Sequence, residues 1–113
     1  MNQPLSVNEA QVRYSQRPLS GNARVEMGWS IAQDAHGPLL PGFAKWDGDE
    51  SPYKTLNYDE VLIVLEGTFG FQLASGERFE GGPETTLRIP KNTAVKYFGS
   101  KAKVFFVITP PGE

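Results

Sequence analysis

Apolar and polar residues alternate over short stretches of this chain, which is the period-two pattern of half-buried β-strands. In residues 23–33 the larger apolar side chains Val25, Met27, Trp29 and Ile31 share one parity. Segment 34–42 follows, and its Gly and Pro content is typical of a loop. We therefore expect a strand from residue 23, a loop to residue 42, and a short strand over 43–46.

The most strand-like part of the chain lies between residues 53 and 73. Residues 53–66 form an apolar-rich stretch, and Gly67 separates it from a segment in which Phe69, Phe71 and Leu73 share a parity. This pattern predicts a strand, a tight turn at Gly67 and a second strand. Three more short strands are expected further along the chain, over 85–90, 93–98 and 102–109.

Many short strands without a convincing helix predict an all-β fold, either a sandwich or a closed barrel. The chain has 113 residues, which suits one domain with one core. Residues 1–22 are polar, carry Pro4 and Pro18, and end in a Ser-Gly-Asn turn signal. We expect an irregular N-terminal arm over 1–22 that lies across a sheet, and a β-domain over 23–113.

Composition excludes several classes of function. Apolar residues make up 39% of the chain, beside 12 Gly and 9 Pro, as in a globular protein rich in turns. The net charge is -2, and the absence of a basic run argues against nucleic-acid binding. There is no cysteine, so disulfides, thiolate zinc sites and cysteine nucleophiles are excluded.

The chain shows no membrane or secretion signal. Its longest apolar run, 61–65, is far shorter than the span of about 20 residues that crosses a bilayer. The N-terminal residues lack the charged and apolar regions of a signal peptide. We expect a soluble cytoplasmic protein that binds neither nucleic acid nor membrane.

Segment 61–65 is apolar at both parities, and 104–109 has the same two-sided character. One face of a lone barrel wall should meet water, so an outward apolar row must be covered by something. The N-terminal arm or a second subunit would do so. We predict a homodimer packed sheet against sheet.

Two segments resemble the two sequence motifs of the cupin superfamily. EVLIVLEG, at 60–67, is similar to the end of the first motif through Glu60 and Gly67, and LRIPKNTAVKYFG, at 87–99, is similar to the second through Pro90. Asn92, Val95 and Gly99 stand where the second motif has glycine, histidine and asparagine. The resemblance implies a single cupin double-stranded β-helix, or jelly-roll barrel, with a cavity between the strands of the two motifs.

Within the cupins, the chain most resembles the ethanolamine-utilisation EutQ-like proteins. The similarity is carried by TLNYDE at 55–60, VLEG at 64–67 and IPKN at 89–92. It implies a barrel that is frequently dimeric, a link to ethanolamine metabolism and bacterial microcompartments, and an acetate kinase activity.

The usual cupin metal site combines three imidazoles with one carboxylate, donors that suit transition metals. The histidine positions fall here on other residue types: the first two on Lys54 and Leu56, or on Tyr53 and Thr55, and the third on Val95. Glu60 alone keeps its identity. We therefore expect no metal site and no cofactor.

Two other routes to metal binding are the one histidine, His36, and a hard cation such as Mg²⁺. His36 lies among turn-forming residues, where a loop position is expected rather than a ligand. Mg²⁺ remains possible if the protein is a phosphotransferase, because magnesium needs few protein ligands and keeps its waters.

Adjacent side chains of an extended strand point to opposite faces, so Tyr58 and Glu60 share a face and Asp59 takes the other. A Glu60 carboxylate at the mouth of an apolar interior would have a raised pKa that suits acid or base chemistry. The alternative is a structural Glu60 that pairs with Lys54 or a backbone amide.

A polar ring is the expected ligand site, formed by Lys54, Tyr58, Glu60 and Tyr97. Such a ring would grip a small anion or polyol, with Trp46 and Phe71 as walls. Tyr97 is placed inside because it shares the parity of Val95. Core packing is the alternative role of each aromatic residue.

Two functions follow from these residues and the resemblance. The first is a cupin without the three-histidine metal site that binds a small polar or anionic metabolite, or serves as an accessory protein in ethanolamine-type metabolism. The second is an enzyme, either an acetate-kinase-like phosphotransferase or an isomerase with Glu60 as the catalytic general base. Known phosphate loops and nucleophile elbows are missing. Phosphotransfer would therefore depend on the lysines near the mouth, Lys45, Lys54, Lys91 and Lys96.

Overall fold

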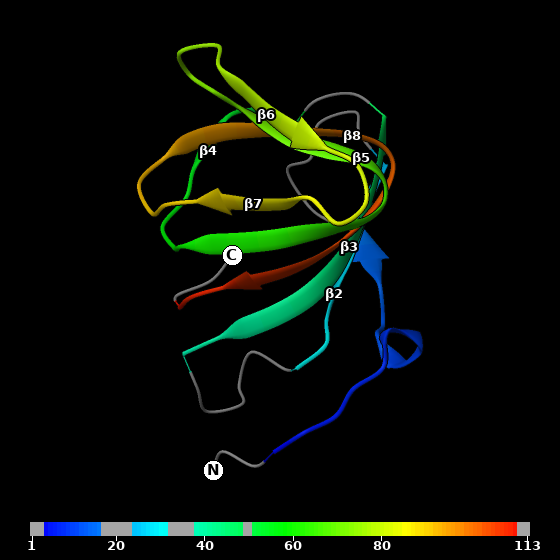
Figure 1. The fold of residues 1–113 in the computed structure, drawn as a ribbon. Helices are drawn as coiled ribbons and strands as arrows, with labels where there is room; N and C mark the ends of the chain where they lie inside the picture. The colour runs from blue at the N-terminus through cyan, green and yellow to red at the C-terminus, as the bar shows by residue number, and fades with distance from the viewer. Residues whose placement is uncertain (1–3, 17–23, 32–37, 49–50, 111–113) are drawn as a thin grey trace.

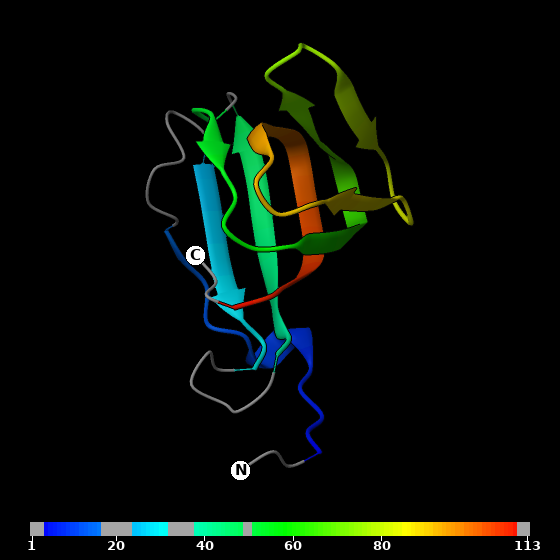
Figure 2. The same cartoon turned by 90° about the vertical axis from the view of Figure 1, so that its left-hand side faces the viewer.

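The computed structural model of the chain describes residues 4–16, 24–31, 38–48 and 51–110. Within these ranges the chain is all β apart from one short 3-10 turn, as the alternation predicted (Figures 1 and 2). The elements are η1 (Glu9–Gln11), β1 (Ser15–Gln16), β2 (Arg24–Trp29), β3 (Leu40–Gly48), β4 (Lys54–Thr55), β5 (Glu60–Leu73), β6 (Arg78–Gly81), β7 (Thr86–Ile89) and β8 (Ala94–Ile108). None of the helices in this part of the chain is long and apolar enough to cross a membrane.

Two long bent strands, β5 and β8, organise the barrel. They run antiparallel over their whole lengths, from the pairing of Glu60 with Ile108 to that of Leu73 with Val95. The first half of β5 also pairs with β7 and its second half with β6, while β8 pairs with β4 and β3 at its two ends. Because both strands belong to two layers, the sheet wraps around one interior (Figure 1).

The bend of β5 lies at Gly67, where the register with β8 shifts twice. The φ angle of Gly67 is +68°, and a Cβ there would come within 2.2 Å of the Lys101 carbonyl oxygen. The predicted tight turn at Gly67 is therefore wrong: the chain passes through a bulge and continues in the same strand. Likewise, the two strands expected over 93–98 and 102–109 are one continuous strand, β8.

Gly67 alone does not distinguish a tight turn from a bulge, and the reason is physical. A positive φ is required both in tight hairpin turns and in glycine bulges, so one residue predicts either. The choice depends on the strand opposite, which here bends at Lys101 with φ of +47°. Strand β3 also differs from expectation, because it begins at Leu40 inside the predicted loop and pairs with the end of β8.

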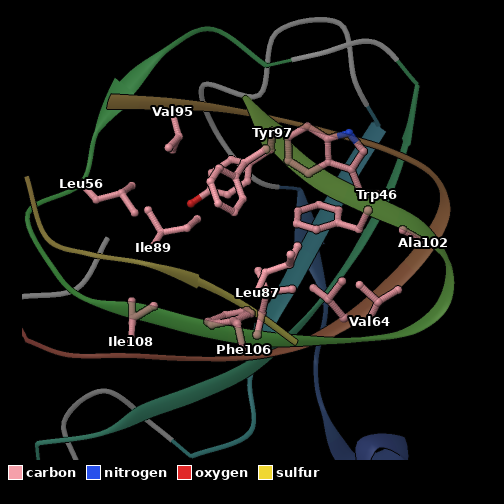
Figure 3. Close-up of a cluster of buried hydrophobic side chains, with 14 of the residues drawn as sticks. Trp46, Leu56, Val64, Leu87, Ile89, Val95, Tyr97, Ala102, Phe106 and Ile108 are labelled. Atoms are coloured by element: carbon pink, nitrogen blue, oxygen red, sulfur yellow. The ribbon is translucent and has the colours of Figure 1, made fainter. Parts of the chain in front are cut away.

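The core fills the space between the two layers (Figure 3). In β5 the buried side chains Leu62 and Val64 alternate with Val61 and Leu65, which are exposed. Val25 of β2 is buried on the parity expected from the sequence. Among the most completely buried side chains of the described residues are Val25, Leu56, Val64, Ile89, Val95, Val104 and Ile108.

The described part of the N-terminal arm, 4–16, packs on the outside of the sheet and adds β1 to the edge of β2. The Tyr14 hydroxyl donates to Glu9 at 2.7 Å, and the Lys45 ammonium lies 4.3 Å from the centroid of the Tyr14 ring. Lys103 Nζ lies 3.8 Å from a Glu9 carboxylate oxygen. The arm therefore contacts β3 and β8, but it leaves Val61 of β5 45% exposed.

Candidate functional site

Residues 58–60, which lead into β5, direct two polar side chains into the barrel. Tyr58 and Glu60 are buried, at 3% and 8% exposure. Asp59, between them, is exposed and accepts a hydrogen bond from the Lys91 backbone N–H at 2.9 Å. This is the alternation expected of an extended strand, so one carboxylate enters the barrel and the other fixes a loop outside it.

A cavity lies beside these side chains, between β2, β3, β5 and β8. The space in it that the centre of a water molecule can reach has a volume of about 40 Å³. One water needs about 10–15 Å³ on this scale, so a few waters or one small organic molecule would fit. The walls are mostly aliphatic and aromatic, and the polar groups come from Trp46, Tyr58, Glu60 and Tyr97.

The central polar contact joins Glu60 to Tyr97 across the barrel. The Tyr97 hydroxyl donates to Glu60 Oε1 at 2.7 Å, and both residues are buried. Figure 3 shows the Tyr97 ring inside the barrel with its oxygen directed toward the interior. A donor in this position stabilises the charged form of a carboxylate and fixes its orientation toward the cavity.

Ser51 holds Tyr97 in place, and sequence reasoning missed it. The Tyr97 backbone N–H donates to Ser51 Oγ at 2.9 Å, and the Ser51 N–H donates to the Tyr97 carbonyl at 2.9 Å. Ser51 is 5% exposed, although it stands next to Pro52 in a segment that reads as a turn. Its only sequence signal is a hydroxyl residue before the predicted strand.

Three aromatic rings form one end of the cavity wall. The Phe69 and Tyr97 rings stack with centroids 5.8 Å apart, and Trp46 packs against both, at 5.8 Å and 5.9 Å. Trp46 and Phe69 both line the cavity, and of the two the sequence singled out only Trp46. Phe71, expected as a wall, instead stacks on Phe79 at 5.1 Å and does not line the cavity.

The error over Phe71 has a simple cause. Phe69 and Phe71 share a parity, so alternation correctly places both on the inner face, where both are buried. Position along the strand decides which of them reaches the cavity, and the bend at Gly67 sets that position.

Lys54 reaches the same region from β4. Its ammonium group donates to the Tyr58 hydroxyl at 3.3 Å, while Glu60 accepts from Tyr97. Two hydrogen bonds thus connect members of the expected polar ring, one between Lys54 and Tyr58 and one between Tyr97 and Glu60. Of the other lysines expected near the mouth, Lys45 contacts Tyr14 on the outer face, and Lys96 Nζ lies 5.2 Å from the Tyr53 ring centroid.

The positions that hold histidines in metal-binding cupins carry other chemistry here. Leu56 and Val95 are fully buried in the core, and under the other alignment Tyr53 and Thr55 are exposed. Among the residues described by the structure, no group of three His, Cys, Asp or Glu side chains is placed to hold a metal ion. His36 lies outside the described residues.

A family model, described as ethanolamine utilisation protein EutQ, matches residues 8–113 of the chain. A search of curated proteins found no match.

Solved structures share the fold. A putative ethanolamine utilization protein Q from Salmonella typhimurium LT2 superimposes with a TM-score of 0.81 and 21% identity, over 96% of this chain and 86% of that one. The EutQ protein of Clostridium difficile superimposes with a TM-score of 0.74 and 22% identity, over 94% of this chain and 74% of that one. The Cnp3 cupin domain of Schizosaccharomyces pombe superimposes with a TM-score of 0.69 and 11% identity, over 90% of this chain and 66% of that one. The barrel is therefore the cupin jelly roll that the two sequence motifs predicted.

Proposed function

This chain belongs to the ethanolamine utilisation protein EutQ family, and from that premise we propose that it binds a small polar metabolite inside its barrel. It would act either through that binding or as an accessory protein in ethanolamine-type metabolism. The observation that carries the proposal is the buried pair of Glu60 and Tyr97, which faces a cavity inside the barrel.

A purely structural role does not account well for this pair. Burying a carboxylate costs free energy even when it is hydrogen-bonded, and an apolar side chain of similar volume would often be more stable. A few polar groups converging on a mostly apolar cavity are the usual arrangement of a small-molecule site. Trp46 and Phe69 would contact the apolar part of the ligand, and Glu60 would accept its hydrogen bonds.

The size and charge of the cavity restrict the ligand. A volume of about 40 Å³ suits a molecule of a few non-hydrogen atoms. The buried carboxylate of Glu60 disfavours an anion, so of the two ligand types expected from sequence the polyol type fits better than the anionic type.

To test the proposal, a substitution can fill the cavity and leave its polar side chains unchanged. Ala44 lines the cavity, and Ala44→Leu would occupy part of it. We expect a thermal-shift screen of small alcohols, amines and acids to find stabilising ligands for the wild type, and Ala44→Leu to abolish the shift. Ala94→Leu, a half-buried alanine of β8 away from the cavity, is the matched control and should keep the response.

Loss of ligand response in both alanine variants would point to general destabilisation and count against the cavity. If no compound in the screen raises the melting temperature of the wild type, the binding function itself is contradicted.

One observation favours a catalytic alternative, an isomerase with Glu60 as general base. The carboxylate is buried, oriented by a hydroxyl and in contact with a cavity, which is the setting of many proton-transferring carboxylates. If so, Glu60→Gln should bind ligand but lose turnover by about 10²- to 10⁴-fold. For phosphotransfer, acetyl phosphate formation from ATP and acetate with Mg²⁺ is the direct assay, and equal rates for wild type and Glu60→Gln would exclude Glu60 from it.

A further inference from the structure

The exposure of the residues that line the cavity shows where its wall is open. Of the described residues in the wall, only Met27 of β2 and Ala44 of β3 are half-buried, and the others are buried. These two residues are direct partners in the pairing of β2 with β3. Met27 shares the inward parity of Val25, so solvent reaches its side chain from the inner side of the sheet. The mouth of the cavity therefore lies at Met27 and Ala44.

Of the two side chains at the mouth, that of Met27 is the one that can move. Alanine has only a methyl group, whereas methionine is unbranched and has three rotatable bonds. Met27 packs against the core but keeps part of its surface in solvent. Side chains with exposed surface change rotamer within nanoseconds, so Met27 can swing away from the mouth.

The backbone around the mouth is held on both sides, so the strand itself is poorly suited to open. Met27 pairs with Ala44 of β3 on one side and with Ser15 of β1 on the other. The N-terminal arm lies directly on Gly28, where a Cβ would come within 2.4 Å of the Arg13 carbonyl oxygen. Separating the strands would break backbone pairing, whereas turning one side chain breaks none.

We propose that Met27 is the gate of the cavity, a side chain that closes the mouth and swings aside to admit a small molecule. This inference rests on the proposed binding function, and it adds the entrance and the residue that controls it. Neither Met27 nor Ala44 carries a charge, so an ion that passes between them would lose water without compensation. The gate therefore favours slim, uncharged molecules.

An introduced thiol can report access to the cavity, because the chain has no cysteine of its own. Val104→Cys places the thiol in the cavity wall, at a position that is 1% exposed. Val64→Cys is the matched control, because Val64 pairs with Val104 and is 0% exposed but does not line the cavity. Mass spectrometry follows the reaction of each with methyl methanethiosulfonate under native conditions. We expect Val104→Cys to react faster than Val64→Cys.

Two substitutions of Met27 should change that rate in opposite directions. Met27→Ala should speed the reaction at Val104→Cys about fivefold, because opening no longer takes a half-buried side chain out of its contacts. Met27→Ile should slow the reaction, because a β-branched side chain is stiff at χ1 and swings aside less readily. Neither should alter the rate at Val64→Cys, whereas general destabilisation would speed both reactions.

The width of the reagent tests selectivity at the mouth. Benzyl methanethiosulfonate carries the same reactive group on a wider molecule. The preference for the methyl reagent over the benzyl reagent should be larger at Val104→Cys than at Val61→Cys, where the side chain is 45% exposed. Met27→Ala should reduce the preference at Val104→Cys toward the value at Val61→Cys.

The outcomes separate the gate from the binding function on which it rests, because the labelling uses no ligand of the protein. A rate at Val104→Cys that neither Met27→Ala nor Met27→Ile changes would overturn the gate, as would a rate no higher than at Val64→Cys. Stabilising compounds in the ligand screen would then keep the binding function alone. Labelling as expected, with no stabilising compound in the screen, would leave an accessible cavity and contradict the binding function.

Discussion

Glu60 and Tyr97 show how two residues far apart in sequence define the chemistry of this barrel. Glu60 begins β5 and Tyr97 lies near the start of β8, yet their side chains meet at 2.7 Å inside the barrel. The hydroxyl satisfies part of the hydrogen-bonding capacity of a carboxylate that is only 8% exposed. The pair therefore links the proposed ligand contact to the stability of the fold.

Removing the Tyr97 hydroxyl should destabilise the protein measurably. Tyr97→Phe keeps the ring and its stacking on Phe69 but leaves the buried carboxylate one donor short. Such a loss costs about 1–3 kcal/mol. Urea denaturation followed by tryptophan fluorescence measures it.

Two further variants isolate the interaction. In a Glu60→Gln background the cost of Tyr97→Phe should shrink, and the difference is the coupling between the two groups. Tyr53→Phe is the matched control, because that hydroxyl also donates a hydrogen bond but Tyr53 is 46% exposed. Equal losses for the two tyrosines, or no coupling to Glu60, would contradict the interpretation.

At the scale of elements, the bend of β5 determines where the inner side chains point. Gly67 and Lys101 face each other with positive φ angles, and the two strands turn together from one layer into the next. We expect Gly67→Ala to lose at least about 2 kcal/mol, since the left-handed backbone alone costs about 1–2 kcal/mol in a residue with a side chain. The new Cβ would also collide with the backbone of Ser100 and Lys101.

Gly76 offers a comparison for that prediction. It too has a positive φ, of +95°, but apart from its two chain neighbours no described residue has an atom within 4 Å of where a Cβ would be. Gly76→Ala should therefore show only the conformational penalty, and its loss should be smaller in the same urea experiment. A larger loss at Gly76 than at Gly67 would mean that the bulge tolerates a side chain.

The N-terminal arm provides a pH-dependent element. The hydrogen bond from Tyr14 lowers the pKa of Glu9 below its usual 4.5, and the charges of Lys103 and Lys45 act in the same direction. A carboxyl with a lowered pKa in the folded state stabilises the arm above about pH 4.5 and loses that effect as pH falls through the folded pKa. We expect the protection factors of Ser15 and Gln16 of β1, which compare the observed hydrogen exchange with the intrinsic rate at the same pH, to fall on acidification through this range.

Tyr14→Phe should return the pKa of Glu9 toward 4.5, which a carboxyl NMR titration would show. Asp47 is an internal control, since its pKa is lowered by the Lys101 backbone N–H and by Arg24, neither of which involves Tyr14. A Glu9 pKa unchanged in Tyr14→Phe would assign its lowering to the lysines instead.

At the scale of the whole molecule, one outer surface remains apolar. Val61 and Leu65 are 45% and 39% exposed, and Ile63 stands between them. The neighbouring strand β8 adds Phe105 and Val107, which pair with Ile63 and Val61. The described arm covers neither Val61 nor Leu65, which leaves a second copy of the chain as our proposed cover for this outer apolar face.

We predict a homodimer through the outer apolar face, and light scattering at micromolar concentration measures it. Val61→Asp should shift the mass toward the monomer, because a buried unpaired carboxylate opposes association. Thr68→Asp, an exposed position on the other half of β5, should leave the mass unchanged. A wild-type monomer would contradict the prediction.

Much of the fold could be predicted from local pattern. The all-β class and the shared face of Tyr58 and Glu60 follow from period-two alternation, because each residue of an extended strand reverses the face of the one before. The cupin motifs added the barrel, and the family model and solved structures confirm it. The expected roles of Glu60, Lys54, Tyr58, Tyr97 and Trp46 in binding remain predictions.

The sequence by itself determined which side chains share a face of a strand, because facing is a property of neighbouring residues. Only the tertiary structure decided which of them meet. In the tertiary structure Glu60 is hydrogen-bonded to Tyr97, whose backbone N–H is bound by Ser51. Phe69 rather than Phe71 lines the cavity, and Gly67 lies in a bulge rather than a tight turn. These outcomes depend on the pairing and bending of β5 against β8, which are contacts between distant segments that no local pattern encodes.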